Sequence, residues 1–435
     1  MNIVPIFCFL ACFSIVLSAL RKGADILSPF RVFGFVWAAV IGLTEMKLSG
    51  FQHEWSAYSW AVLLSAVVSV LVGILFVDTV LLNRARYVPL SSLRSGPGRI
   101  PDGIQRKYVG VLGILAGLYL VSYAAEVVVL GNVPVFSPYP DRARMAFGIF
   151  GVHLIVTLAP AILILATEYF LVFRKTLRHK TEVLAIFIIT FLSYSLLLQR
   201  FSFVMWVVVS SCLAYYYSRY VNWKSLLVAS GGFTAFIMFL QSIRLSRYVE
   251  NYIYVVSRMR ISRAFAALSE PYMYTVMNLE NFARGVDRLD TFTMGLFTFD
   301  PLLALVGLKH PAQDYFGVIE RPFLNSGYNT FPFMWTYYRD FGYGGMVLIC
   351  LVLGIAIAYY YNRFRTDPTL YRAAIYALGV FFMTLSFFTN VLTMLNMATN
   401  IGLIYLVNRA LFPGGKTGPG GVPVNVFPEV RDGRS

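Results

Sequence analysis

The sequence predicts an all-α polytopic membrane protein with about eleven transmembrane helices and one long, partly helical loop. Three observations predict this class. Of the 435 residues, 58% are hydrophobic and only 13% are charged, whereas soluble globular domains carry about 25% charged residues. Apolar runs of about 18 or more residues, each long enough to cross a bilayer as a helix, recur along the chain. One long stretch, residues 244–344, interrupts them.

The apolar runs follow one another closely before residue 244 and resume after residue 344. They are 3–20, 29–46, 58–82, 109–130, 148–173, 183–198, 201–217, 225–243, 345–361, 373–390 and 394–411. The first run has no basic start and no small-x-small cleavage site, and another run follows it directly, so we expect a span there and not a cleaved signal peptide. We expect one membrane domain over residues 1–412, which includes the loop 244–344, and a disordered cytoplasmic tail over 413–435, where Gly and Pro are frequent.

The distribution of Lys and Arg predicts the orientation. Twenty-two of the 36 basic residues fall in one set of connecting segments, which we assign to the cytoplasm because short cytoplasmic loops are rich in positive charge. Both termini then follow, with the N-terminus outside and the C-terminus inside. The long loop 244–344 then lies outside; long loops largely escape the charge rule, so its arginines do not contradict the assignment.

Charge and residue types exclude several classes of function. The net charge of +15 indicates contact with membrane lipids and phosphate groups, because no nucleic-acid-binding motif accompanies it. The four cysteines lie in predicted spans, where we expect packing residues, and the four histidines are scattered and show no zinc-ligand spacing. We expect neither a metal nor another cofactor.

Arginines on the outer side form three clusters around predicted helix ends. The first follows the turn Gly131–Pro134, the second opens a short outer hairpin, and the third lies where a span enters the long loop. Arg is suited to bidentate phosphate contacts. We predict that Arg142, Arg200 and Arg244 hold a pyrophosphate with support from Arg144 and Arg247. The alternative is that each arginine only anchors its helix end to lipid headgroups.

The long loop combines aromatic and polar side chains at its two ends. Pro271-Tyr272 and Asn278-Leu279 come early, and the runs Tyr328-Asn329-Thr330 and Asp340-Phe341-Gly342-x-x-Gly345 close the loop. We predict that Tyr328, Asn329 and Tyr338 contact a glycan, since aromatic rings stack on sugars. An aromatic belt at the membrane interface is the alternative.

These motifs resemble those of the bacterial oligosaccharide repeat-unit polymerases, the Wzy or O-antigen polymerase family. The Gly-x-x-Pro turn with Arg142 and Arg144, Arg200 at the start of a span, and the two ends of the long loop all match, and with the span layout the resemblance covers most of the chain. Many members carry a histidine before the asparagine that corresponds to Asn329, whereas this chain has Tyr328 there.

The resemblance implies transfer of a growing glycan from undecaprenyl pyrophosphate to a sugar hydroxyl of another lipid-linked repeat unit. Arginines would stabilise the pyrophosphate leaving group without a metal, and a carboxylate would serve as general base. We predict Glu320 and Asp340 for that role. The alternatives are a salt bridge for Glu320 and a favourable helix-dipole contact for Asp340.

Three other classes remain open at this stage, and one of them, a structural membrane protein, would not need the outer arginines. An O-antigen ligase would share the architecture and the arginines and differ in its acceptor. A secondary transporter would need internal repeats and ionisable residues near the bilayer midplane, and only Glu126 and Glu168 come close to that requirement. The expected partners are lipid-linked glycans, membrane lipids and a chain-length regulator, with no nucleic acid.

Overall fold

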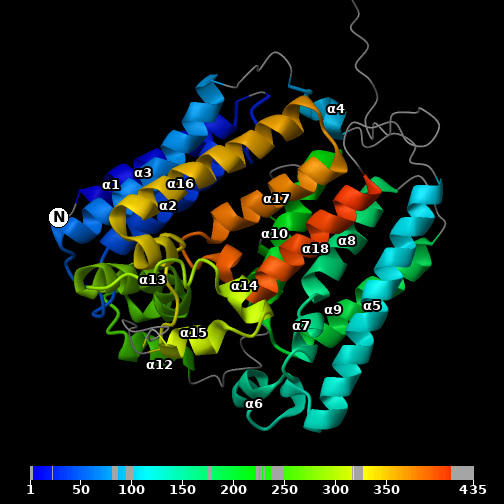
Figure 1. Cartoon of the computed structure of the whole chain (residues 1–435). Helices are drawn as coiled ribbons and strands as arrows, with labels where there is room; N and C mark the ends of the chain where they lie inside the picture. Colours follow the sequence, from blue (N-terminus) through cyan, green and yellow to red (C-terminus); the bar gives the residue numbers. More distant parts are fainter. Residues whose placement is uncertain are drawn as a thin grey trace, which may run out of the picture. The chain divides into compact units, whose positions relative to one another are not determined.

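The computed structural model describes residues 3–21, 23–80, 87–94, 102–173, 179–221, 249–315 and 327–412, together with a few residues between 225 and 236 and Gly317. Throughout these ranges the secondary structure is helical (Figure 1). An isolated antiparallel bridge joins Ser49 to Met259, and no strand forms among the described residues. The predicted tail 413–435 lies outside them.

The chain divides into two compact units, each built from segments that are distant in sequence. Unit 1 comprises Met1–Asn83, Arg247–Asn362 and Phe382–Ala398, and unit 2 comprises Arg84–Ser246, Arg363–Phe381 and Thr399–Ser435. The chain therefore passes repeatedly between the two units, and neither unit corresponds to one continuous half of the sequence.

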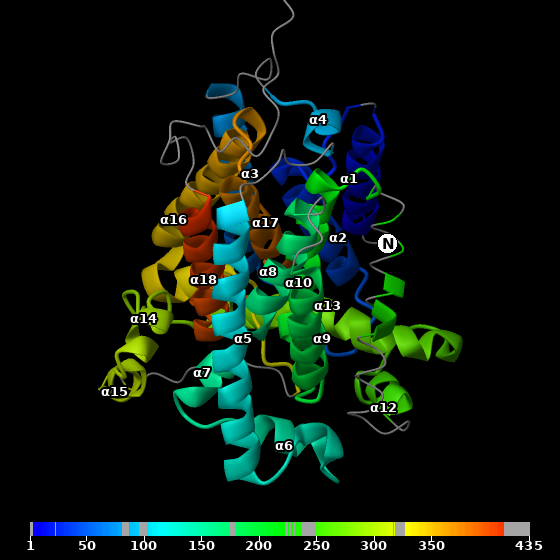
Figure 2. The same cartoon turned by 90° about the vertical axis from the view of Figure 1, so that its right-hand side faces the viewer.

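Unit 1 combines long apolar helices with the short helices of the long loop. Its helices are α1 (Val4–Ala19), α2 (Pro29–Glu45), α3 (Ala57–Val80), α12 (Val249–Val256), the 3₁₀ helix η3 (Arg263–Leu268), α13 (Ser269–Arg288), α14 (Asp300–Leu305), α15 (Lys309–Tyr315), most of α16 (Met334–Thr366) and the 3₁₀ helix η4 (Val391–Thr393). In both views, α12 to α15 gather toward one end of this unit (Figures 1 and 2).

Two glycines allow α3 and α16 to cross in close contact. A Cβ atom on Gly73 would lie 2.4 Å from the carbonyl oxygen of Leu351, and one on Gly354 would lie 2.2 Å from that of Val70. Any larger residue would push the two backbones apart. Close crossing at small residues is typical of helices that pack inside a bilayer.

Unit 2 is organised around α8, which is buried along almost its whole length. Its helices are α4 (Leu90–Arg94), α5 (Asp102–Leu130), the 3₁₀ helix η2 (Pro134–Phe136), α6 (Pro140–Ala146), α7 (Val152–Val156), α8 (Ala159–Val172), α9 (Lys180–Ser195), α10 (Arg200–Tyr217), and most of α17 (Leu370–Leu385) and α18 (Leu395–Leu411). Asn400 of α18 accepts a 3.0 Å hydrogen bond from the Ala161 backbone and donates a 2.7 Å hydrogen bond to the Thr157 carbonyl. These bonds satisfy polar backbone atoms at the start of α8.

Helices occupy ten of the eleven predicted spans, and the remaining run, 225–243, lies mostly outside the described residues. Four helical stretches are long and apolar enough to cross a membrane: Ala57–Val80, Asp102–Phe136, Val152–Val172 and Met334–Thr366. Val4–Ala19 and Leu370–Leu385 are apolar but shorter. The helical class is confirmed, whereas the count of eleven spans stays a prediction.

The long loop ends at a break within α16. Gly342 has φ 64° and ψ −165°, which is not helical, so Met334–Phe341 forms a separate short helix before the apolar helix resumes. That backbone conformation is almost restricted to glycine. The break falls two residues before the predicted end of the loop at Gly344 and separates Asp340 from the span.

Candidate functional site

At one end of unit 2 lies the turn that the sequence singled out. Gly131 has φ 65°, which glycine adopts without strain, and Pro134 begins the short helix η2. The Val135 backbone N–H donates a 3.2 Å hydrogen bond to the carbonyl of Leu196. The predicted turn is therefore attached to the hairpin that joins α9 to α10.

Helix α6 brings Arg142 and Arg144 to the same end of the unit. In both views this helix lies beyond the C-terminal end of α5, and α4 lies at the opposite end (Figures 1 and 2). Arg144 forms an ion pair with Asp141 at 3.4 Å. Arg142 is exposed, and its guanidinium carbon lies 5.7 Å from the centroid of the Tyr139 ring. Arg142 is thus accessible to an external anion.

Arg200 is the first residue of α10 and follows Leu198 and Gln199 at the tip of the hairpin. Leu198 has φ 57°, a left-handed conformation that turns the chain sharply before the helix. The positive end of the helix dipole adds to the charge of the guanidinium here. The Val135–Leu196 hydrogen bond places this helix start beside the turn that leads to α6.

Three of the five predicted pyrophosphate ligands therefore lie on segments that meet at one end of unit 2. The other two, Arg244 and Arg247, lie outside the described residues, as does Glu320.

A polar chain that sequence analysis did not identify lies between these segments. Nδ1 of His153, on α7, lies 3.2 and 3.0 Å from the two carboxylate oxygens of Glu126, on α5. Nε2 of His153 lies 3.2 Å from Nε2 of Gln199, the residue before Arg200. The Glu126 carboxylate also accepts a 3.0 Å hydrogen bond from the Ile149 backbone. Positions 126, 153 and 199 are far apart in sequence, and no local motif predicts their contact.

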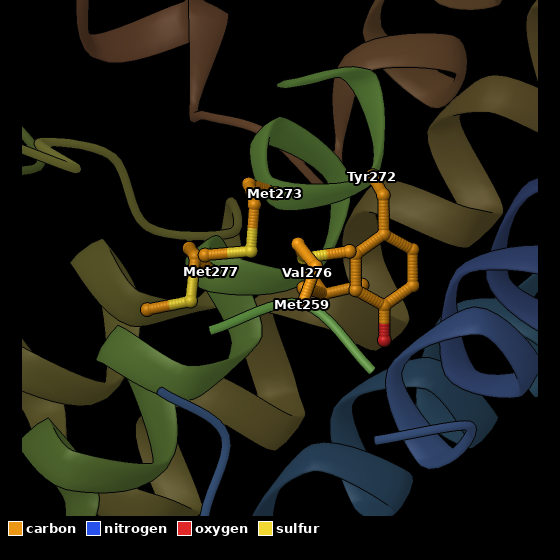
Figure 3. Close-up of a cluster of buried hydrophobic side chains, with 5 residues drawn as sticks. All are labelled: Met259, Tyr272, Met273, Val276 and Met277. Atoms are coloured by element: carbon orange, nitrogen blue, oxygen red, sulfur yellow. The ribbon is translucent and has the colours of Figure 1, made fainter. Parts of the chain in front are cut away.

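In unit 1, helix α13 forms the base of a second polar region. Its apolar face packs in a cluster with Met259 (Figure 3). Tyr272 is at the edge of this cluster, and its hydroxyl points away from the methionines. That hydroxyl accepts a 3.0 Å hydrogen bond from the Leu48 backbone and lies 2.6 Å from Oε1 of Gln52. Burial raises the pKa of Tyr272 to about 12, against the opposing effect of these hydrogen bonds.

Two of the sequence motifs meet at α13. The side-chain amide of Asn281 donates hydrogen bonds to the carbonyls of Tyr328 and Thr330 at 3.2 and 3.0 Å. The Thr330 hydroxyl donates a hydrogen bond to the side chain of Asn278. The early and late parts of the long loop therefore come together, and α13 holds the segment 328–330 in place.

The predicted glycan-contacting residues differ in exposure. Asn329 is exposed, and Tyr328 is half-buried with its ring 6.3 Å from that of Tyr274. Tyr338 is buried, and its hydroxyl lies 3.3 Å from that of Tyr58. Asn329 and Tyr328 are thus better placed than Tyr338 for contact with a ligand.

Asp340 holds a loop in this structure. It is fully buried, and its carboxylate accepts hydrogen bonds from the Thr293 hydroxyl and from the backbone N–H groups of Phe297 and Thr298, the last two at 3.2 and 2.6 Å. A carboxylate with both oxygens occupied is poorly placed to take a proton from a substrate. Asp340 also lies just before the break at Gly342, after which the apolar helix resumes, so the helix-dipole alternative stays open.

A second buried carboxylate of unit 1, with less complete pairing, lies on α13. Glu280 of α13 shares Lys47 with Glu45, with oxygen–nitrogen distances of 3.6 and 3.3 Å, and Glu280 accepts a 3.3 Å hydrogen bond from the His53 backbone. Burial raises the pKa of Glu280, although the ammonium group of Lys47 opposes this shift. Glu280 follows the Asn278-Leu279 motif directly, and no sequence pattern predicted a role for it.

Within the described ranges no group of three or more His, Cys, Asp or Glu side chains could hold a metal ion.

Comparison with known proteins found no match: no family model, no curated protein and no solved structure matches this chain significantly. The proposed function therefore rests on the sequence motifs and on the side chains of the two polar regions.

Proposed function

We propose that the protein is a membrane glycosyltransferase that polymerises undecaprenyl-pyrophosphate-linked oligosaccharide repeat units at the outer leaflet of the bacterial inner membrane. One observation supports this most directly. At one end of unit 2, the segments that bear Arg142, Arg144 and Arg200 are joined by the Val135–Leu196 hydrogen bond. Two helical stretches of the same unit, Asp102–Phe136 and Val152–Val172, are long and apolar enough to cross a membrane.

The proposed reaction uses the arginines to stabilise the leaving group. The acceptor hydroxyl oxygen forms a bond to the anomeric carbon of the growing glycan, and the bond from that carbon to the lipid pyrophosphate breaks. Negative charge then develops on the pyrophosphate. A guanidinium group can donate two parallel hydrogen bonds to phosphate oxygens, so Arg142 and Arg200 suit this role, with Arg144 in support.

The first test is polymer length in a strain that lacks the chromosomal gene and carries variant copies. We expect Arg142→Lys and Arg200→Lys to give short glycans, because lysine keeps the charge and loses the planar donor fork. The Ala variants should be worse. Arg219→Ala is the control, since this exposed arginine follows the opposite, C-terminal end of α10 and contacts Tyr220. Normal polymer from the Arg142 and Arg200 Ala variants, at normal protein levels, would contradict the proposal.

A second test asks whether the reaction needs a metal. Purified protein supplied with lipid-linked repeat units should form polymer in excess EDTA, because the arginines supply the positive charge that the leaving group requires. Loss of polymer on chelation, with recovery on addition of magnesium, would contradict metal-independent catalysis. It would leave open the assignment of the protein as a polymerase.

Two alternatives make different predictions. A ligase would transfer the glycan to a different acceptor and would not extend lipid-linked repeat units alone. A transporter is favoured by one observation, the buried Glu168 of α8, which contacts the Tyr108 hydroxyl at 2.9 Å and the Asn408 amide at 3.1 and 3.2 Å. Acids inside spans often mark ion pathways. Ion-driven uptake into liposomes, abolished by Glu168→Gln, would support this alternative.

A further inference from the structure

We infer that His153 is the general base of the proposed transfer reaction and that Glu126 is the residue that positions it. This inference rests on the proposed polymerase function. It differs from the carboxylate bases expected from the sequence: Asp340 is engaged with the loop 293–298, and Glu320 lies outside the described residues. The observation that supports it is the contact of His153 with a fully buried carboxylate on one side and with the residue before Arg200 on the other.

The proposal requires one tautomer of the His153 ring. In that tautomer Nδ1 carries the proton and donates it in the hydrogen bond to the Glu126 carboxylate. Nε2 then carries no proton, and its lone pair accepts a 3.2 Å hydrogen bond from the side-chain amide of Gln199. The Gln199 carbonyl in turn accepts a 3.0 Å hydrogen bond from the Tyr194 hydroxyl. A buried carboxylate that fixes the imidazole in this way is the arrangement that prepares histidine for proton transfer.

A general base must be accessible to its substrate, whereas the residue that positions it can be buried. The Glu126 side chain is 0% exposed, whereas the His153 side chain is 25% exposed. Gly148, with φ 135°, leaves room for the ring, since a Cβ atom there would lie 2.7 Å from its Cγ. The imidazole is therefore partly accessible from outside the protein, whereas the carboxylate is not. An acceptor hydroxyl that displaced the Gln199 amide would meet the basic nitrogen directly.

The acceptor hydroxyl gives its proton to Nε2 of His153 as its oxygen bonds to the anomeric carbon of the donor glycan. The electron pair of the broken carbon–oxygen bond leaves with the lipid pyrophosphate, next to the arginines. The imidazolium, held by the Glu126 carboxylate, then releases its proton to water.

The chain offers a matched control for a histidine–glutamate pair. His179 and Glu182 are also in unit 2, at 2.8 Å, but Glu182 is 60% exposed and the pair lies at the start of α9. We expect His153→Gln to lower kcat for polymer extension by about 10²–10⁴-fold, the usual contribution of a general base. KM for the lipid-linked donor should be little changed. His179→Gln should match the wild-type protein.

Glu126→Gln tests the positioning role. It should lower kcat with KM unchanged. The double variant with His153→Gln should be no slower than His153→Gln alone, because each change removes the same function, proton transfer to the histidine. Added imidazoles should restore turnover to His153→Ala in proportion to their basicity, which a purely structural histidine would not show. An additive loss in the double variant, or no dependence of rescue on basicity, would overturn the assignment.

A second measurement avoids variants of the pair. In a protein with His53, His179 and His310 changed to Gln, His153 is the only histidine, and diethyl pyrocarbonate should abolish extension reversibly, with recovery in hydroxylamine. Full activity after modification of His153 would overturn the inference. Extension by wild type and His153→Gln at equal rates would overturn it and leave the polymerase proposal standing. If wild type forms no polymer, both fail.

Discussion

At the residue scale, the buried carboxylates differ in how their charge is balanced. Asp340 accepts hydrogen bonds from three donors of one loop. Glu280 and Glu45 instead face a single ammonium group, that of Lys47. Burial raises the pKa of Glu280 even with Lys47 present, so folding favours its neutral form.

This shift predicts how Glu280→Gln changes stability with pH. A folded-state pKa above the ordinary value of 4.5 contributes stability that is complete below 4.5 and is lost as the pH rises through the raised pKa. Gln resembles the neutral acid and does not titrate. The apparent unfolding temperature of Glu280→Gln in detergent should therefore rise relative to wild type as the pH increases above 4.5.

Asp290→Asn is the control for this experiment. Asp290 is exposed shortly after α13, so its carboxylate is solvated in the folded and unfolded states, and its variant should follow wild type over the same range. If the unfolding temperature of Glu280→Gln differs from that of wild type by the same amount at every pH, Glu280 has the same pKa in the folded and unfolded states. That result would contradict the burial argument.

At the element scale, apolar helices were predictable from sequence and their polar connections were not. Runs of apolar residues are local, and ten of the eleven predicted runs coincide with helices. The contacts of His153 with Glu126 and with Gln199 arise from tertiary packing over separations of 27 and 46 residues. The motif Asp340-Phe341-Gly342 was visible in the sequence, but its structural role was not, because the groups it holds lie about 40 residues away.

The break at Gly342 gives a prediction about α16. Its φ of 64° and ψ of −165° are almost restricted to glycine, and a Cβ atom there would lie 3.0 Å from the ring of Phe292. Gly342→Ala should therefore destabilise the protein by about 1–3 kcal/mol, seen as a lower unfolding temperature. Gly344→Ala is the matched control, since no atom lies within 4 Å of its added Cβ. Equal unfolding temperatures for the two variants would show that the break can straighten without cost.

At the scale of the whole molecule, the chain returns several times to each of its two units, and both polar regions belong to single units. The arginine-bearing end is complete within unit 2 for the described residues, as α5, α6, α7 and the start of α10 all belong to it. Sequence patterns could not predict this division, because each unit is assembled from three separated segments. They did predict that α4 and α6 lie on opposite sides of the membrane.

That last expectation can be tested within unit 2 alone. Ser91 on α4 and Ala146 on α6 are both exposed, and the helix Asp102–Phe136 between them is long enough to cross a membrane. In a background without Cys8, Cys12, Cys212 and Cys350, Ala146→Cys in intact cells should react with a membrane-impermeant maleimide. Ser91→Cys should react only after the membrane is permeabilised, because the basic segment around it belongs inside. The reverse pattern would place the arginines in the cytoplasm, where no outer-leaflet polymerase could use them.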